Sequence, residues 1–221
     1  MRLFWFGLMV IVVGVTGMLV RGLMAADAAA TQDVSEDSKM KKATFAAGCF
    51  WGVEEAFGHV PGVVSTRVGY IGGKTQKPTY KDVCTDETGH AEAVEVTYDP
   101  GKVSYAELLD AFWSCHNPTT LNQQGPDFGS QYRSAIFTHD AEQAKLAKAS
   151  LKEVEESKVF KKKIVTEIAP AGTFWTAEEY HQKYMEKHGG ACHTGIAVVK
   201  TKLAEEGRKA RAAAGATATK P

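Results

Sequence analysis

Few cysteines and no surplus of charge mark this sequence. Only four cysteines occur in 221 residues, and none forms a C-x-x-C pair, which excludes a disulfide-rich scaffold, a zinc ribbon and a thioredoxin motif. Lys plus Arg and Asp plus Glu number 26 each, so neither a basic nucleic-acid-binding protein nor an acidic disordered protein fits the chain. The dipeptides Cys115-His116 and Cys192-His193 lack the spacing of metal ligands. We therefore expect no nucleic-acid partner and no metal site.

One long apolar run is present, at residues 3–20, where no residue is charged. An A-x-A cleavage sequence, Ala26-Asp27-Ala28, follows it. The run is longer than the roughly 7 to 15 residues of a signal-peptide core and approaches the roughly 17 to 25 of a membrane-spanning helix. Residues 1–28 are therefore interpreted as either a cleaved signal peptide or a retained N-terminal membrane anchor. Both predict that the rest of the chain is exported, to the periplasm or another extracytoplasmic space.

The remainder divides into a linker, one domain and a tail. Residues 29–42 are polar and unpatterned, residues 200–221 are low in complexity with no apolar period to bury, and one domain is expected over residues 43–199. The apolar periodicity predicts strands at 43–47, 63–70, 90–98, 134–138 and 163–169, and helices at 50–57, 105–115, 141–157 and 178–187. Capping boxes at residues 104–107 and 176–179 open two of the helices. This order predicts an α/β sandwich with helices packed on a mixed sheet.

Cys49 follows the first predicted strand and begins the first predicted helix, within Gly48-Cys49-Phe50-Trp51-Gly52. Free N–H groups and the positive end of the helix dipole favour a thiolate at such a position. Phe50 and Trp51 are adjacent and point to different sides of a helix, so at least one of them should flank the sulfur. We predict that Cys49 is a reactive nucleophile rather than a buried structural cysteine.

Glu92 is unusual because it lies on the apolar face of an alternating strand, in line with Val94, Val96 and Tyr98. Desolvation raises the pKa of a carboxyl group held there toward neutrality, where the group can give a proton. We predict that Glu92 is a proton donor. The alternative is a glutamate that simply reaches solvent.

A polar loop at residues 117–133 is rich in Gly, Pro, Asn and Gln. Loops of this kind either carry a site or merely connect two elements. Asp127, Tyr132 and Arg133 are its candidates for a functional role.

Several sequence blocks together resemble the A-type peptide methionine sulfoxide reductases. They occur in the family's order and close to its spacing, across roughly residues 43–195, and the combination is highly specific. The blocks are GCFWG at 48–52, PTY at 78–80, VCT at 83–85, TGHAEAV at 88–94, QYRSAI at 131–136 and EYHQKY at 179–184. The resemblance implies an α+β fold, a two-layer α/β sandwich with a ferredoxin-like mixed sheet. It also implies an enzyme, a peptide-methionine (S)-S-oxide reductase, that reduces free or protein-bound methionine sulfoxide of the S configuration.

The resemblance also assigns roles to single residues. Cys49 would attack the sulfoxide sulfur, and Glu92 would protonate the oxygen as the sulfur–oxygen bond breaks, which leaves methionine and a Cys49 sulfenic acid. Phe50 and Trp51 would form an apolar pocket for the S-methyl group. Three further positions match those that hold the sulfoxide oxygen in the family: Tyr80, Asp127 and Tyr132.

Regeneration requires a second thiol, which converts the sulfenic acid to a disulfide that an external thioredoxin-like dithiol reduces. Cys192 resembles the family's resolving cysteine and follows Gly189-Gly190, a segment with the flexibility to reach Cys49. Many relatives place a tyrosine before this cysteine or add a third cysteine in the tail. Here Ala191 precedes Cys192 and no cysteine follows it, so a two-cysteine cycle is the simplest interpretation.

Two cysteines and a group of aromatic residues receive no catalytic role. Cys84 matches a family position without a catalytic role and is expected to be buried. Cys115 has no assigned partner. Tyr180, His181 and Tyr184 have helical spacing, which favours packing and hydrogen bonding over catalysis.

Two other classes of function remain as alternatives. One is a module that binds methionine sulfoxide without turnover, although the set of Cys49, Glu92 and Tyr132 argues against it. The other is a cysteine hydrolase, which requires a histidine base that the sequence does not assign. For the reductase we expect no bound cofactor, a monomer, and two kinds of partner: oxidised proteins or peptides, and a thioredoxin-like reductant. Its role would be protein repair after oxidative damage.

Overall fold

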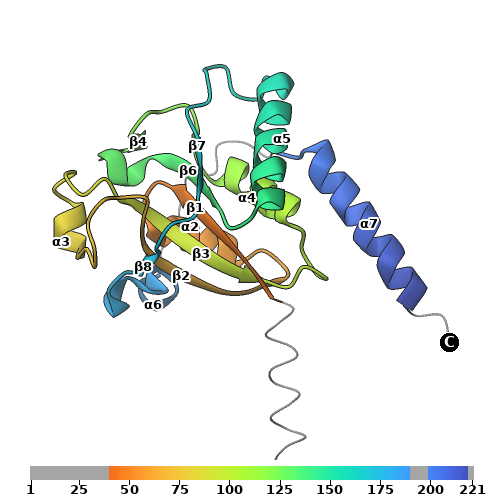
Figure 1. Ribbon diagram of the computed structural model, residues 1–221, viewed down its shortest axis with the longest axis horizontal. Helices are drawn as coiled ribbons and strands as arrows, with labels where there is room; N and C mark the ends of the chain where they lie inside the picture. Colours follow the sequence, from red (N-terminus) through yellow and green to blue (C-terminus); the bar gives the residue numbers. More distant parts are fainter. Residues whose placement is uncertain (1–39, 190–198, 219–221) are drawn as a thin grey trace, which may run out of the picture. The chain divides into compact units, whose positions relative to one another are not determined.

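Six strands form one mixed sheet in the order β7-β6-β1-β3-β2-β8 (Figure 1). The structure is a computed structural model that describes residues 40–189 and 199–218. Strands β6 and β7 pair in parallel, and the other four pairs are antiparallel. The predicted mixed sheet is therefore confirmed. The strands are β1 (Lys41–Ala47), β2 (Val63–Ile71), β3 (Ala91–Tyr98), β6 (Ser134–Thr138), β7 (Glu167–Pro170) and β8 (Trp175–Thr176).

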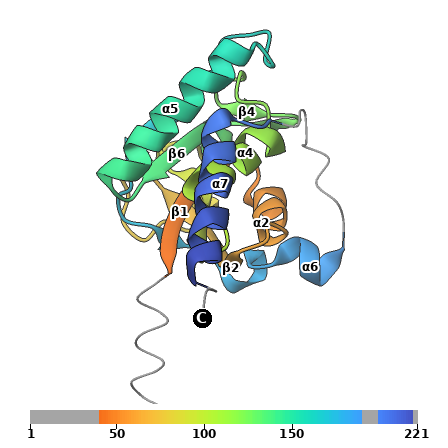
Figure 2. The same ribbon diagram turned by 90° about the vertical axis from the view of Figure 1, so that its right-hand side faces the viewer.

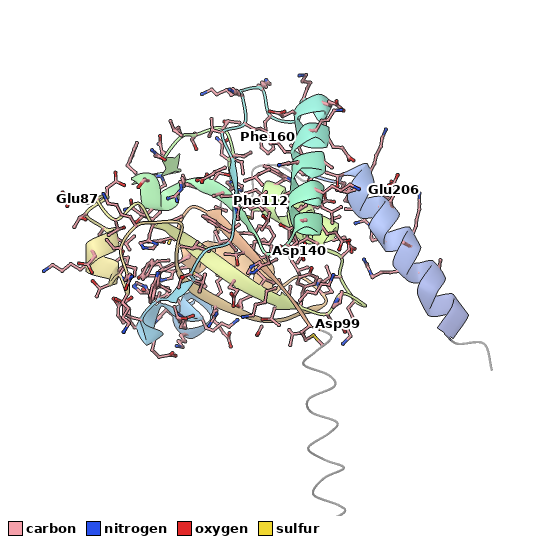
Figure 3. The ribbon with its side chains drawn as sticks, in the orientation of Figure 1. Glu87, Asp99, Phe112, Asp140, Phe160 and Glu206 are labelled. Atoms are coloured by element: carbon pink, nitrogen blue, oxygen red, sulfur yellow. The ribbon has the colours of Figure 1, made fainter. Side chains whose placement is uncertain are left out.

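Helices and short turns connect these strands. The predicted capping box of α4 is present, because the Ser104 side chain accepts the N–H of Glu107 and the Glu107 side chain accepts the N–H of Ser104. Helix α5 begins after Asp140, whose carboxylate accepts the N–H of Gln143 at 2.7 Å (Figure 3). The helices are α2 (Phe50–Gly58), α3 (Tyr80–Val83), α4 (Tyr105–Cys115), α5 (Ala141–Ser157), α6 (Tyr184–His188) and α7 (Lys202–Ala218). There are also two 3-10 turns, η1 (Ser130–Tyr132) and η2 (Glu179–His181). A small hairpin pairs β4 (Gln123–Gln124) with β5 (Asp127–Phe128).

The two faces of the sheet bury different side chains. Large apolar residues of the strands pack with those of α2, α4 and α5 in one core. The Phe45 ring lies 4.8 Å from that of Phe57 and 5.5 Å from that of Phe112, and Figure 3 shows Phe112 in the interior. The opposite face carries mostly small residues, such as Ala46 and Ala93, in a second and smaller cluster. Helices thus form one layer and the sheet the other, which confirms the predicted two-layer sandwich.

Helix α7 corrects the prediction of a low-complexity tail over residues 200–221. Asp110 on α4 accepts hydrogen bonds from the N–H (3.1 Å) and the hydroxyl (2.7 Å) of Thr201. Glu107 pairs with Arg211, and Ala204 is fully buried. Helices α7 and α4 are in contact, and Figure 2 shows α7 in front of α4. The contacts are made by small and polar residues, which is why no apolar period marks this helix in the sequence.

Other boundaries differ from the prediction as well. Strand β7 begins at Glu167, four residues after the start of the strand predicted at 163–169. Strand β1 begins at Lys41, inside the predicted linker of residues 29–42, because Lys41 pairs with Tyr98. The helix predicted over 178–187 is two short pieces, η2 and α6. Thr176 cannot cap a helix because it pairs with Gly69 as part of β8, and the left-handed Lys183 (φ 54°) separates the two pieces.

Other predictions fall on residues that the structure does not describe. These are the export segment of residues 1–28, most of the linker, and Cys192. In the described ranges, 40–189 and 199–218, no helix combines the length and apolar character needed to cross a bilayer.

Candidate active site

Cys49 lies in the turn between β1 and α2. It is the N-cap residue of α2 and is half-buried, so its side chain stands at the end of the helix where the N–H groups of the first turn have no partner within the helix. Gly48 before it has a φ of +96°, and a Cβ atom there would lie 2.6 Å from Cγ of Gln124. Both features require glycine. The strand–turn–helix setting predicted for the cysteine is thus present.

Glu92 is buried on β3, with 2% of its surface exposed. Its Oε2 accepts the backbone N–H of Phe50 at 3.0 Å. Burial raises the pKa of Glu92 to about 8, and the charge of Asp127 acts in the same direction, while the hydrogen bond from Phe50 opposes the rise. The carboxyl group is therefore mostly protonated at neutral pH. The predicted burial of Glu92 is confirmed, and the alternative of a solvent-exposed glutamate is wrong.

Three other predicted residues come from separate elements and meet near Glu92: Tyr80 begins α3, Asp127 lies on β5, and Tyr132 ends η1. Burial raises the pKa of Tyr80, and a hydrogen bond with Cys84 and the charge of Glu92 add to the rise. Burial also raises the pKa of Tyr132, with further contributions from Glu92, Asp127 and Cys49. The charges of Cys49 and Glu92 therefore both act on this group of hydroxyls.

Phe50 and Trp51 lie in an aromatic cluster. Phe50 is buried, and its ring centroid is 5.0 Å from that of His181. Trp51 is half-buried; its indole N–H donates to Nδ1 of His181 at 3.0 Å, and its ring stacks on Tyr184 at 3.7 Å and 8°. Burial lowers the pKa of His181, which favours the neutral ring, and Nδ1 accepts the indole N–H and so carries no proton. Packing and hydrogen bonding, the roles favoured for His181 and Tyr184, are what these residues do here.

Glu178 lies within the capping box predicted over residues 176–179, which the structure does not form. Its carboxylate accepts the hydroxyl of Tyr70 and the backbone N–H of Tyr80, both at 2.9 Å. Tyr70 is fully buried and lies directly opposite Glu92 in the pairing of β2 with β3. Glu178 thus joins α3 to the sheet beside the candidate acid. No local pattern indicates this role, because its partners are about 100 residues away in the sequence.

The remaining candidates have other environments. Cys84 is exposed at the end of α3, so the prediction that it is buried is wrong; the four-residue helix turns it outward. Cys115 is buried, and its S–H donates to the carbonyl of Phe112 at 3.3 Å. Arg133 donates to Glu167 (3.2 Å) and to the carbonyl of Ser130 (3.0 Å), which ties η1 to β7. In the part of the chain that the structure describes, no group of three His, Cys, Asp or Glu side chains could hold a metal ion.

Comparisons with known proteins agree with one another. A family model described as peptide methionine sulfoxide reductase matches residues 41–212. Peptide methionine sulfoxide reductase MsrA of Methanoculleus marisnigri is 60% identical over 162 residues, which is 73% of this chain and 99% of that protein. MsrA of Geobacter sulfurreducens is 58% identical over 157 residues, 71% of this chain and 97% of that protein.

The fold is also similar to that of solved methionine sulfoxide reductase structures. Reduced Mxr1 from Saccharomyces cerevisiae has a TM-score of 0.67 at 39% identity, covering 72% of this chain and 92% of that one. Methionine sulfoxide reductase A of Corynebacterium diphtheriae has a TM-score of 0.62 at 37% identity, covering 73% and 84%.

Proposed function

The chain belongs to the peptide methionine sulfoxide reductase family, A type, and is an oxidoreductase; on that basis we propose that it reduces the S epimer of methionine sulfoxide, free or in proteins, to methionine. The observation that carries the proposal is the buried Glu92, which holds a proton up to about pH 8 and bonds to Phe50, the residue after Cys49.

In the first step the Cys49 thiolate attacks the sulfoxide sulfur while Glu92 gives its proton to the sulfoxide oxygen. The sulfur–oxygen bond breaks, the oxygen passes to the cysteine, and methionine and a Cys49 sulfenic acid result. The sulfoxide is reduced by two electrons and the thiol is oxidised by two. The hydroxyls of Tyr80 and Tyr132, with Asp127, bind the oxygen, and the rings of Phe50 and Trp51 accept the S-methyl group. Selectivity for one epimer follows because oxygen and methyl bind on separate walls.

In the second step the Cys192 thiol attacks the Cys49 sulfenic acid, and a disulfide and water form. A thioredoxin-like dithiol then reduces the disulfide and is itself oxidised. The family membership and the sequence around Cys192 support this step. Export directed by residues 1–28 would place the cycle in the periplasm or another extracytoplasmic space, where the enzyme repairs oxidised proteins with a reductant of that compartment.

The test is dithiol-driven reduction of a peptide carrying S or R methionine sulfoxide, with mass spectrometry of the oxidised protein. We expect turnover of the S epimer alone, no turnover by Cys49→Ser, and a Cys49–Cys192 disulfide that Cys192→Ser lacks. A folded protein that binds the sulfoxide without turnover would instead be a binding module. A disulfide from Cys49 to Cys115 would mean that Cys192 is not the resolving thiol.

The hydrolase alternative has less support. It requires a histidine base at Cys49. His181 accepts the indole N–H of Trp51 through Nδ1 and packs against the rings of Phe50 and Tyr80, contacts that suit a packing role, and the family membership favours the reductase.

A further inference from the structure

We propose that Glu54 is a positioning residue of the reductase, which holds Tyr184 against Trp51 and thereby fixes the wall for the S-methyl group. The inference rests on the proposed function for the role of Trp51 as that wall. Glu54 follows Trp51 by three residues on α2, so the two side chains lie on neighbouring parts of the helix surface. Only 2% of Glu54 is exposed. A carboxylate buried to this extent must have partners.

The partners of Glu54 come from two other elements. Oε2 accepts the backbone N–H of Lys183 at 2.7 Å, and Oε1 accepts the hydroxyl of Thr66 at 3.0 Å. The ammonium of Lys183 lies 3.8 Å from Oε1 and donates to the Thr66 hydroxyl at 2.5 Å. Glu54 therefore binds both the main chain and the charge of Lys183.

Lys183 needs such support because its backbone is left-handed, with φ 54° and ψ 39°. Residues other than glycine rarely adopt this left-handed backbone conformation. The conformation reverses the chain between η2 and α6, and Tyr184 becomes the first residue of α6. Tyr184 then stacks on Trp51, and His181, two residues before Lys183, accepts the indole N–H. Figure 2 shows α6 beside α2.

One helix thus contacts the segment from His181 to Tyr184 at three points. Trp51 supplies two of them, the stack and the hydrogen bond, and Glu54 supplies the third, at the residue between. Loss of the carboxylate leaves the N–H of Lys183 without its acceptor and the left-handed turn without support. The Tyr184 ring would then lose its alignment with the indole. A wall that recognises one methyl group is sensitive to such a shift, since a single methyl is worth roughly tenfold or more in discrimination.

The experiment compares the full-length protein with Glu54→Ala, Glu54→Asp, Glu54→Gln and the neighbouring Glu55→Gln. The substrate is a peptide with S methionine sulfoxide and the reductant is dithiothreitol. The first readout is kcat and KM. The second is the emission spectrum of Trp51, obtained as the difference from a Trp51→Phe protein, which reports the stack whether or not turnover occurs.

We expect Glu54→Ala to raise KM about tenfold or more with a smaller effect on kcat, and to shift the Trp51 emission. Glu54→Asp keeps the charge but is one methylene too short, so it should behave like Glu54→Ala. Glu54→Gln keeps an acceptor for the Lys183 N–H and should resemble the parent, as should Glu55→Gln. If Glu54→Ala does not fold, the contrast between Glu54→Asp and Glu54→Gln decides the question.

Unchanged KM and unchanged Trp51 emission in a folded Glu54→Asp protein would overturn the proposal, since Glu54 would then only stabilise the fold. Equal behaviour of Glu54→Asp and Glu54→Gln would overturn it as well. Failure of the proposed function is distinguishable, because the parent protein itself would then reduce neither epimer, while the Trp51 emission would still report on the position of Tyr184.

Discussion

Phe50 donates its backbone N–H to Oε2 of Glu92 at 3.0 Å. The bond joins the first residue of α2 to the second residue of β3, and it comes from the residue next to Cys49. A hydrogen bond of this kind favours the charged carboxylate, but burial outweighs it and the pKa of Glu92 stands at about 8. The candidate acid is thus oriented by the same turn that presents the candidate nucleophile.

The protonation of Glu92 predicts how the rate depends on pH. Because its pKa is raised to about 8, the group keeps its proton below that pH and loses it above. The rate of methionine formation in a single turnover should therefore fall as pH rises through about 8. Glu92→Gln, which cannot donate a proton to the oxygen, should be slower by about 10²- to 10⁴-fold and should lack this alkaline fall. An unchanged alkaline fall in Glu92→Gln would show that another group causes it.

The same pKa predicts how stability depends on pH. The pKa of Glu92 in the folded protein lies above its ordinary value of 4.5, so the folded state binds the proton more tightly. The stabilisation is fully present below about pH 4.5 and is lost as pH rises through about 8. The urea midpoint should decrease less between pH 5 and pH 8.5 in Glu92→Gln than in the parent, with thiols kept reduced. Equal decreases would contradict the assignment.

Glu178→Ala should destabilise the protein by about 1 to 3 kcal/mol, because it leaves the buried hydroxyl of Tyr70 and the N–H of Tyr80 without their acceptor. Urea unfolding measures the loss. Glu179→Ala is the matched control, since the exposed Glu179 side chain pairs only with Lys187 in the contacts described. In a Tyr70→Phe background Glu178→Ala should destabilise the protein less, because the hydroxyl is already absent. An undiminished effect there would show that the destabilisation does not come from the lost bond to Tyr70.

The contact of Thr201 with Asp110 predicts that α7 contributes to stability. Thr201→Val removes a 2.7 Å hydrogen bond from a buried carboxylate, and a loss of about 1 to 3 kcal/mol in urea unfolding is expected. Lys209→Ala on the same helix removes only an exposed ion pair with Glu205 and should leave the midpoint unchanged. No loss in Thr201→Val would show that this hydrogen bond at the start of α7 does not contribute to the stability of the fold.

The spacing of apolar residues in the sequence correctly predicted the strands and helices that neighbouring residues alone determine. Alternation along residues 90–98 located Glu92 on the buried face, and the bounds of β6 and α5 match the predicted ones. Thr176 and Glu178 resemble the start of a helix in the sequence. In the structure Thr176 pairs with β2 as part of a strand, and Glu178 accepts hydrogen bonds from the hydroxyl of one distant tyrosine and the backbone N–H of another. Helix α7 packs through Ala204, Thr201 and ion pairs, which carry no apolar period. The short strand at Thr176, the role of Glu178 and the packing of α7 all depend on partners that are distant in the sequence, so local patterns do not reveal them.

Strand pairing gives the candidate site an all-or-none character. Tyr70 pairs with Glu92, and Phe45 pairs with Val94, on the two sides of β3. Because side chains alternate between faces, a slip of β3 by one residue would turn Glu92 to the opposite face and bring Glu95 and Thr97 into the helix-covered core. No intermediate position exists for the acid. The specific activity of a refolded preparation should therefore report the fraction of chains with correctly paired strands, and misregistered chains would be inert rather than slow.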